Sequence, residues 1–255
     1  MGKVVLITGA SAGLGEEFAF QLAEQGFSLL LVARRALRLQ AIQQQLQLQY
    51  PELAIHYLCA DLSDNQAPVQ IMNYVQAQSL QLVGLINNAG FGQRGLFSDI
   101  ALDTHLAMLQ VNIRSLVALT YLVIPAFTSQ KQSFIVNVAS TAAFQAGPNL
   151  AVYYASKAFV LSFSEALHEE LKAKNIQVSA LCPGATDTEF AEVAELSDSV
   201  LFTLRVMAKQ PVVRYSLDNL NKAVVIPGFI NKFGALMAQL VPRAIARKLA
   251  YRIQK

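Results

Sequence analysis

The sequence is poor in several residue types, and each shortage excludes a class of protein. It contains no tryptophan, two cysteines and three histidines in 255 residues. Two cysteines exclude a disulfide scaffold, and three scattered histidines at no ligand spacing lead us to expect no bound metal. Charged residues make up 15% and hydrophobic residues 54%, which excludes a disordered chain. Cys59 and Cys182 lie in apolar, strand-like runs, so we expect both in the core.

Acidic residues are scarce in the last fifth of the chain. Residues 205–255 hold ten Lys and Arg against Asp218 alone, a net charge of +9, whereas the first 204 residues carry a net charge of −6. Three interpretations stay open: a solvated helix face, a contact with an anionic partner such as a membrane surface or a charged substrate, or a contact with a second subunit. Nucleic-acid binding is not expected, because the basic residues share their segment with apolar runs and no reading motif is present.

Targeting and membrane-spanning signals are weak. Residues 1–11 have no apolar stretch before a small-residue cleavage site, and Leu6 stands where a myristoylation signal needs Ser or Thr. The window 223–241 is apolar, but Pro227, Gly228 and Lys232 interrupt it, so a surface-lying amphipathic element is favoured over a spanning helix. We expect a cytoplasmic protein, with membrane association left open.

Short β-branched runs alternate with longer amphipathic stretches, which predicts strands separated by helices. Because the runs are apolar on both faces, they predict an α/β fold with a doubly wound parallel sheet, a Rossmann fold, covered by helices on both faces. We expect a single domain over 1–255, with a cofactor-binding and catalytic core over 1–185. Residues 186–255 are expected to form a substrate lid and a short C-terminal helical extension. The predicted strands are 3–8, 28–32, 55–59, 82–86, 133–138, 176–181 and 223–226, and the predicted helices are 14–25, 36–49, 67–78, 104–128, 152–174, 191–208, 229–240 and 243–253.

A glycine-rich loop joins the first strand to the first helix. Glycine permits a tight turn and lets backbone N–H groups approach a pyrophosphate, while the helix N-terminus adds a favourable dipole. A glycine loop alone is weak evidence, but its place between a first strand and a first helix is typical of dinucleotide binding. The expected phosphate-binding residues are Gly9, Ser11, Gly13, Leu14 and Gly15.

The second strand ends in a sequence that favours NADP over NAD. An NAD site usually places Asp or Glu here to bind the ribose 2′-hydroxyl, but Ala33 holds this position and Arg34 and Arg35 follow. Guanidinium groups bind a 2′-phosphate through charge-assisted hydrogen bonds, and Ser11 can add a hydroxyl. The alternative is a pair of arginines on a solvated helix start, where they would oppose the helix dipole.

A tyrosine and a lysine lie four residues apart on the predicted helix 152–174. Tyr153 and Lys157 therefore share one face, and an ammonium near a phenol lowers a pKa that starts near ~10. That makes Tyr153 a candidate proton donor and acceptor. Ser140 closes the fifth strand, whose carboxyl end faces the expected ligand crevice. Taken alone, the Tyr–Lys spacing is also common in surface pairs.

Together these motifs closely resemble the short-chain dehydrogenase/reductase family over about residues 3–190. The glycine loop matches the family's cofactor loop, and Asp61-Leu62 is similar to its adenine-edge pair. Asn88, Ala89 and Gly90 belong to a match of its NNAG signature. Its catalytic residues correspond to Asn112, Ser140, Tyr153 and Lys157, and its nicotinamide-side loop corresponds to Pro183, Gly184, Thr186 and Thr188.

The resemblance implies hydride transfer between NADPH and a carbonyl or secondary alcohol. Tyr153 would move the proton, Ser140 would hold the substrate oxygen, and Lys157 would lower the Tyr153 pKa and bind the nicotinamide ribose. Asn112 would hold a water that relays protons from Lys157, with a helix-kink or capping amide as its alternative role. The family also implies a homodimer or homotetramer built through helices 104–128 and 152–174.

The substrate is less well determined. Apolar side chains in the expected loops 91–96, 144–150 and 185–200 suggest a small, apolar carbonyl compound such as a keto-acyl or steroid-like substrate. These are Phe91, Leu96, Phe144, Leu150, Phe190 and Leu196. Two further hypotheses stay open, a non-enzymatic NADP-binding redox sensor and a membrane-associated lipid reductase.

Overall fold

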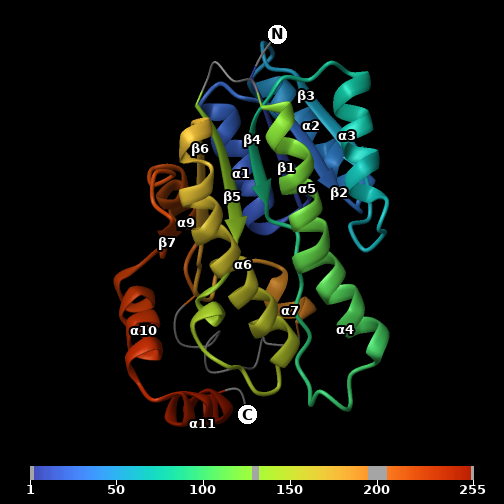
Figure 1. Ribbon diagram of the computed structural model, residues 1–255. Coiled ribbons are helices and arrows are strands. Elements are labelled where there is room, and N and C mark those ends of the chain that lie inside the picture. The colour runs from blue at the N-terminus through green and yellow to red at the C-terminus, as the bar shows by residue number, and fades with distance from the viewer. Residues whose placement is uncertain (1–2, 128–131, 195–205, 254–255) are drawn as a thin grey trace.

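The computed structural model describes residues 3–127, 132–194 and 206–253, and it contains one parallel sheet of seven strands (Figure 1). Their order is β3-β2-β1-β4-β5-β6-β7, and every neighbouring pair runs parallel. This is the predicted doubly wound α/β fold. The strands are β1 (Val4–Thr8), β2 (Ser28–Ala33), β3 (Ile55–Cys59), β4 (Leu82–Asn87), β5 (Ser133–Val138), β6 (Ile176–Leu181) and β7 (Val224–Val225).

Helices cover both faces of the sheet because the strands alternate apolar side chains between two cores. In β1, Val5 and Ile7 belong to one apolar cluster, while Val4 and Leu6 belong to the other. The helices α1 (Gly13–Glu24), α2 (Ala36–Gln49) and α9 (Lys209–Leu217) contribute to the first cluster, and α3 (Ala67–Ala77) and α5 (Leu116–Val123) to the second. Strands buried on both faces explain the continuous apolar runs of the sequence.

One long helical stretch contains a local change of helix type. The predicted helix 104–128 is observed over Leu102–Ala126 as α4 (Leu102–Leu109), a π-helical turn (Gln110–Ser115), α5 and a final 3-10 turn (Ile124–Ala126). This stretch has the length and apolar composition of a membrane-spanning helix. However, α5 packs on β4 and α3, and its Leu119 and Val123 are buried in the second core cluster, so it is a core helix.

The segment after β6 differs from its prediction. Within the predicted helix 191–208, the described part holds only the last three residues of α7 (Phe190–Val193), and residues 195–205 lie outside the described residues. Residues 206–208 are not helical, because Met207 pairs with Thr186 in a parallel bridge. The next helix, α9, was not predicted.

Cys59 and Cys182 have different surroundings. Cys182 is buried, as predicted, whereas Cys59 is exposed, so its predicted core position is wrong. The reason is that β3 is an edge strand and Cys59 is its last residue.

Candidate active site

A large cleft opens at the carboxyl ends of the central strands. It has a volume of about 530 Å³ and is walled by the segments that follow β1, β2, β3, β4, β5 and β6. The strands β1 and β4 are neighbours in the sheet but not in the sequence. From β1 the chain continues to β2 and β3 on one side, and from β4 it continues to β5 and β6 on the other. Such a point is where doubly wound sheets bind ligands.

The glycine loop is folded so tightly that geometry requires all three of its glycines, including Gly13 with φ of +59°. Gly9 has φ of +64°, a conformation that side chains rarely adopt. A Cβ on Gly15 would collide with the carbonyl oxygen of Gly9. The loop leads into α1, whose N-terminus has no side-chain cap, so its first N–H groups are suited to an anion in the cleft.

Thr8 and Asn88 hold this loop against the end of β4. The Thr8 hydroxyl accepts from the backbone N–H groups of Asn88 (3.0 Å) and Ala89 (3.1 Å) and donates to the Ile86 carbonyl (3.2 Å). The Asn88 amide donates to the carbonyls of Thr8 (3.0 Å) and Gly9 (3.2 Å). Asn88 therefore positions the loop in addition to lining the cleft. Thr8, the last residue of β1, was not among the predicted site residues.

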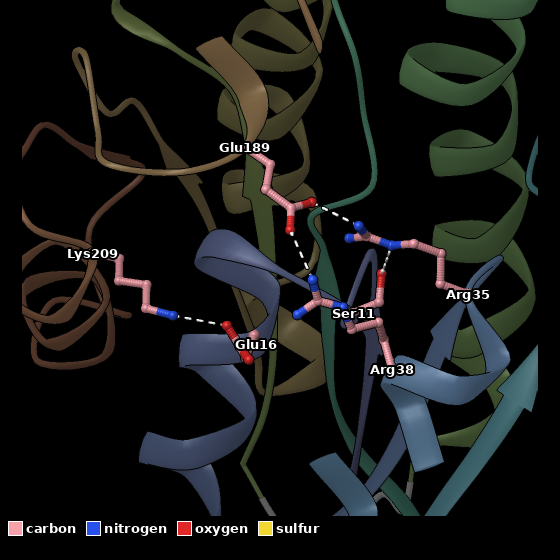
Figure 2. A network of polar contacts seen from close by, with 6 residues as sticks. All are labelled: Ser11, Glu16, Arg35, Arg38, Glu189 and Lys209. Atoms are coloured by element: carbon pink, nitrogen blue, oxygen red, sulfur yellow. Dashed lines mark hydrogen bonds and ion pairs between the residues drawn. The ribbon is translucent and has the colours of Figure 1, made fainter. Parts of the chain in front are cut away.

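Arginines at the start of α2 form the rim of the cleft beyond β2 (Figure 2). Arg35 Nε donates to the Ser11 hydroxyl (3.2 Å), and Arg35 also pairs with Glu189 (2.7 Å). Arg38 lies 3.8 Å from the other oxygen of Glu189. Arg38 and Glu189 were not among the predicted site residues. The signal for Arg38 was its place three residues after Arg35, which puts both on one side of the helix start.

Asp61 and Arg34 complete this end of the cleft. Partial burial acts to raise the pKa of Asp61, but its net pKa lies below the usual value because Ser63 donates to the carboxylate and Arg34 is near. The Ser63 backbone N–H is 2.9 Å from Asp61 Oδ1. Asp61 therefore stays ionised as a hydrogen-bond acceptor at neutral pH.

Tyr153, Lys157 and Ser140 lie together in the cleft wall. Tyr153 and Lys157 lie one turn apart on α6 (Ala151–Glu170), and both line the cleft. Ser140 follows β5 and caps a 3-10 turn (Thr141–Phe144), with its hydroxyl accepting from the Ala142 N–H (3.1 Å). The Ser140 side chain also hydrogen-bonds to Tyr153. Lys157 Nζ donates to the Val138 carbonyl (2.7 Å) and lies 5.8 Å from the centroid of the Tyr153 ring.

Burial has the largest effect on the pKa values of Tyr153 and Lys157. It raises the pKa of Tyr153 well above the usual value, with the hydrogen bond to Ser140 acting in the opposite direction. It lowers the pKa of Lys157 to about 8. The cost of burying the phenolate therefore exceeds the stabilisation by the Ser140 hydroxyl, and the expected effect of Lys157 on the Tyr153 pKa stays a prediction.

Asn112 lies behind the cleft wall, in the π-helical turn between α4 and α5. Its Oδ1 accepts from the Phe91 N–H (3.1 Å), and its Nδ2 donates to the Phe91 carbonyl (3.0 Å) and the Ser156 hydroxyl (3.0 Å). The side chain thus fixes the segment after Gly90 to α6. This geometry supports the structural alternative for Asn112, while the water relay stays a prediction.

The segment after β6 forms the opposite wall. Thr186 donates to the Gly184 carbonyl (3.0 Å) and Thr188 to the Thr186 carbonyl (3.3 Å), which keeps the segment compact. Of the predicted site residues, all line the cleft except Gly15 and Asn112, which pack behind it. The lining residues are Gly9, Ser11, Gly13, Leu14, Arg34, Arg35, Asp61, Leu62, Asn88, Ala89, Gly90, Ser140, Tyr153, Lys157, Pro183, Gly184, Thr186 and Thr188.

Apolar side chains surround Tyr153 at one end of the cleft. Phe91, Leu150 and Phe190 line it, as predicted, and the Phe190 ring lies 5.3 Å from the Tyr153 ring between centroids. Leu96 is exposed, and Phe144 packs into a separate cluster, so neither lines the cleft. The predicted Leu196 lies outside the described residues.

These residues fit a nicotinamide dinucleotide. The uncapped helix N-terminus and its glycine loop suit a pyrophosphate, and Asp61 offers a carboxylate acceptor near the rim. The group formed by Ser140, Tyr153 and Lys157 lies apart from that rim and can transfer a proton beside a reacting carbon. Such an arrangement is that of a hydride-transferring oxidoreductase.

Comparison with known proteins agrees with this geometry. The family model for short chain dehydrogenases matches residues 3–198. The NADP-dependent 3-hydroxy acid dehydrogenase of Schizosaccharomyces pombe is 31% identical over 75% of this chain and 74% of its own length. A short-chain dehydrogenase from Sphingobium yanoikuyae, solved with NADPH, is 32% identical with a TM-score of 0.82, covering 92% of each chain. A bulky-bulky ketone specific alcohol dehydrogenase from Comamonas testosteroni is 28% identical with a TM-score of 0.77, covering 93% of this chain and 91% of its own. The chain therefore belongs to the short-chain dehydrogenase/reductase family of nicotinamide-dependent oxidoreductases.

Proposed function

We propose that this protein is an NADPH-dependent reductase of small, apolar carbonyl compounds that also oxidises the matching secondary alcohols. The observation that carries the proposal is the group formed by the half-buried Ser140 and the buried Tyr153 and Lys157 beside the apolar end of the cleft. A proton donor, a hydroxyl and an ammonium stand together where aromatic and aliphatic side chains exclude water. This combination suits reduction of a carbonyl that has few other polar groups.

Each residue of the group has a separate task. NADPH supplies the hydride when bound. The Tyr153 phenol donates the proton to the carbonyl oxygen, and the Ser140 hydroxyl donates a hydrogen bond to the same oxygen and fixes it near Tyr153. The Lys157 ammonium stabilises the phenolate as the proton leaves. The Val138 carbonyl accepts a hydrogen bond from Lys157 Nζ and so holds the ammonium in the cleft wall.

The raised pKa of Tyr153 favours reduction at neutral pH. Because burial raises its pKa, the phenol stays protonated at pH 7 and is ready to donate. Alcohol oxidation needs the phenolate as the proton acceptor, so we expect its rate to rise with pH. The reduction rate is expected to fall above about pH 8, where Lys157 loses its charge.

The proposed preference for NADP rests on the cleft rim. Arg34, Arg35 and Arg38 stand at the start of α2, and Arg35 already holds the Ser11 hydroxyl. This set of donors suits a phosphate on the adenine ribose. The names of the Schizosaccharomyces and Sphingobium relatives, which specify NADP and NADPH, support the same preference.

Titration with NADPH and NADH tests the cofactor preference. Wild-type protein is expected to bind NADPH about tenfold or more tightly, a margin of about 1.4 kcal/mol, and an Arg34→Ala, Arg35→Ala double variant to lose that margin. Lys172→Ala, Lys174→Ala is the matched charge control. Equal affinity for the two nucleotides in wild-type protein would refute the preference.

A screen of ketones and keto-acyl compounds with NADPH tests the reaction. Tyr153→Phe is expected to lower kcat by roughly a hundredfold or more while NADPH binding persists, because the phenol alone donates the proton. Tyr154→Phe is the control, since it changes the neighbouring phenol on the same helix. If NADPH binds but no compound is reduced, the hypothesis of a redox sensor takes the place of the enzyme.

Self-association is proposed through the face formed by α4. Leu102, Leu106 and Leu109 are all exposed and recur at helical spacing, which is typical of a helix face that packs on a partner. This supports the homodimer or homotetramer that the family resemblance implies. Light scattering of wild-type protein and Leu106→Glu tests it, with a smaller assembly expected for the variant and a monomeric wild type as the contrary result.

A further inference from the structure

The two C-terminal helices extend beyond the sheet. After β7, α10 (Phe229–Leu240) and α11 (Arg243–Ile253) lie at the side of the molecule opposite α4 (Figure 1). We call them the C-terminal arm. The arm begins beside the cleft, since a Cβ on Gly184 would collide with the Asn231 side chain and α10 packs on the turn after Ser140.

In α10 the apolar face points to solvent and not to the core. The side packed on the protein carries small residues, of which Ala235 is buried. Large apolar side chains recur at helical spacing on the other side, with Phe229 82% and Leu240 68% exposed. The exposed apolar residues of α10 are Phe229, Ile230, Phe233, Leu236, Met237 and Leu240. A contiguous apolar surface of this kind marks a binding site.

The second helix continues this surface. In α11, Ala246 and Ala250 are buried, whereas Ile245 and Leu249 are each 57% exposed. They lie four residues apart, on one side of the helix. Both helices therefore bury alanine against the protein and present their larger apolar side chains outward.

The same arm is strongly basic. It carries five described cations and no carboxylate, because Asp218 is the last acidic residue of the sequence. Lys232 donates to the Tyr215 hydroxyl, and no salt bridge in the described ranges involves the arm. The cations are Lys232, Arg243, Arg247, Lys248 and Arg252, and all five are exposed.

Charge decides between two occupants of this surface. A second copy docked symmetrically through the arm would place five cations against five cations, which is repulsive. An anionic bilayer takes apolar side chains into its headgroup boundary and attracts Lys and Arg at its surface. We propose that the C-terminal arm binds the surface of an anionic phospholipid membrane, with the apolar side chains of both helices inserted and the cations on the headgroups.

Vesicle flotation of the full chain tests this proposal independently of any enzyme activity. We expect wild-type protein to float with vesicles of phosphatidylcholine and phosphatidylglycerol, and roughly tenfold less with phosphatidylcholine alone or in high salt. Two variants separate the contributions: Phe233→Gln, Leu240→Gln removes apolar surface, and Arg247→Gln, Lys248→Gln removes charge. Each is expected to lower binding to anionic vesicles by roughly tenfold.

Matched controls change exposed residues elsewhere. Leu37→Gln, Leu48→Gln alters apolar residues of α2, and Lys172→Gln, Lys174→Gln alters cations beside α6, and both are expected to float like wild type. The charge variant changes only exposed side chains, so it reports on binding even if the apolar variant unfolds. Failure of wild type to float, or flotation of the charge variant at the wild-type level, overturns the proposal. A concentration-dependent dimer that Phe233→Gln dissolves, without vesicle binding, would assign the arm to a second copy instead.

Discussion

Glu189 places a carboxylate against the arginines that are proposed to bind the 2′-phosphate of NADPH. It contacts Arg35 at 2.7 Å and Arg38 at 3.8 Å on the rim of the cleft (Figure 2). A carboxylate and a 2′-phosphate compete for the same guanidinium groups. We therefore predict that Glu189→Gln raises the affinity for NADPH by up to about fivefold, the range of an exposed ion pair, and leaves NADH unchanged.

Calorimetric titration measures this effect, with Glu192→Gln in the adjoining helix α7 as the control. A lower NADPH affinity in Glu189→Gln would mean that the carboxylate positions Arg35 for binding and does not compete. Lys209 and Glu16, which pair at 2.8 Å nearby, tie α9 to the first turn of α1 and are not expected to respond.

The burial of Lys157 in the cleft wall lowers the stability of the folded protein at neutral pH, where the side chain is charged. Burial lowers its pKa from 10.5 to about 8, so the unfolded chain binds more protons between these values. The free energy of unfolding should therefore rise with pH between about 8 and 10.5. Lys157→Met removes the buried charge, and we predict that it abolishes this rise and stabilises the protein at pH 7 by up to about 3 kcal/mol.

Urea unfolding near pH 7 and near pH 10 measures the prediction for Lys157. Lys172→Met, an exposed lysine just after the same helix, should leave the pH dependence unchanged. If the free energy of unfolding of Lys157→Met rises with pH as in wild type, other titrating groups cause the rise. The same variant should lose carbonyl reduction, which separates the residue's chemical role from its effect on stability.

At the scale of elements, alanine in place of glycine should have opposite effects on stability at the start of one helix and in the middle of another. Gly15 lies in the first turn of α1, where a Cβ would collide with backbone of the glycine loop. Gly234 lies within α10, where a Cβ would meet no atom within 4 Å. We predict that Gly15→Ala weakens both folding and dinucleotide binding, and that Gly234→Ala stabilises the protein by about 0.5–1 kcal/mol through helix propensity.

Thermal unfolding and NADPH titration of the two alanine variants check this pair. The nucleotide should bind Gly234→Ala as it binds wild type, because α10 lies outside the cleft lining. Tight NADPH binding by Gly15→Ala would contradict this prediction, because it would show that the glycine loop can move away from α1 and still bind the nucleotide.

The sequence predicts those elements whose pattern is local. The limits of β3, β5 and β6 and of α2, α10 and α11 were predicted to the residue, because strand runs and helical spacing are visible over a few neighbours. The helix α9 was missed because Pro211 and polar residues obscure its pattern, and the bridge between Thr186 and Met207 joins residues 21 positions apart. The π-helical turn at Asn112 likewise leaves no trace in the spacing.

In the site, too, the residues with a local sequence pattern were predicted and those without one were not. Residues at strand ends and in the glycine loop were predicted together, because the carboxyl ends of parallel strands meet at one edge. Glu189 was not predicted, since its partner Arg35 lies 154 positions away and pairing at that range has no local signal. The raised pKa of Tyr153 could not be predicted either, because it depends on how much of the cleft wall covers the phenol.

At the scale of the whole molecule, the cleft joins distant parts of the chain. Its walls include the loop at Gly9 and the segment at Phe190, with every central strand between them. A ligand in the cleft therefore binds only the folded arrangement. NADPH at about 100 times its Kd should stabilise the native state by about 2.7 kcal/mol. For 255 residues this corresponds to a rise in Tm of roughly 5 °C.

A thermal melt with and without nucleotide measures this rise, and the rim arginines supply the control. In Arg34→Ala, Arg35→Ala, the shift with the same NADPH concentration should shrink toward that with NADH, since only the 2′-phosphate contact is lost. Unfolding of this variant without nucleotide should match wild type, because both arginines are exposed. Absence of any shift with either nucleotide in wild type would mean that the cleft does not bind a dinucleotide, and the proposed reaction would fail with it.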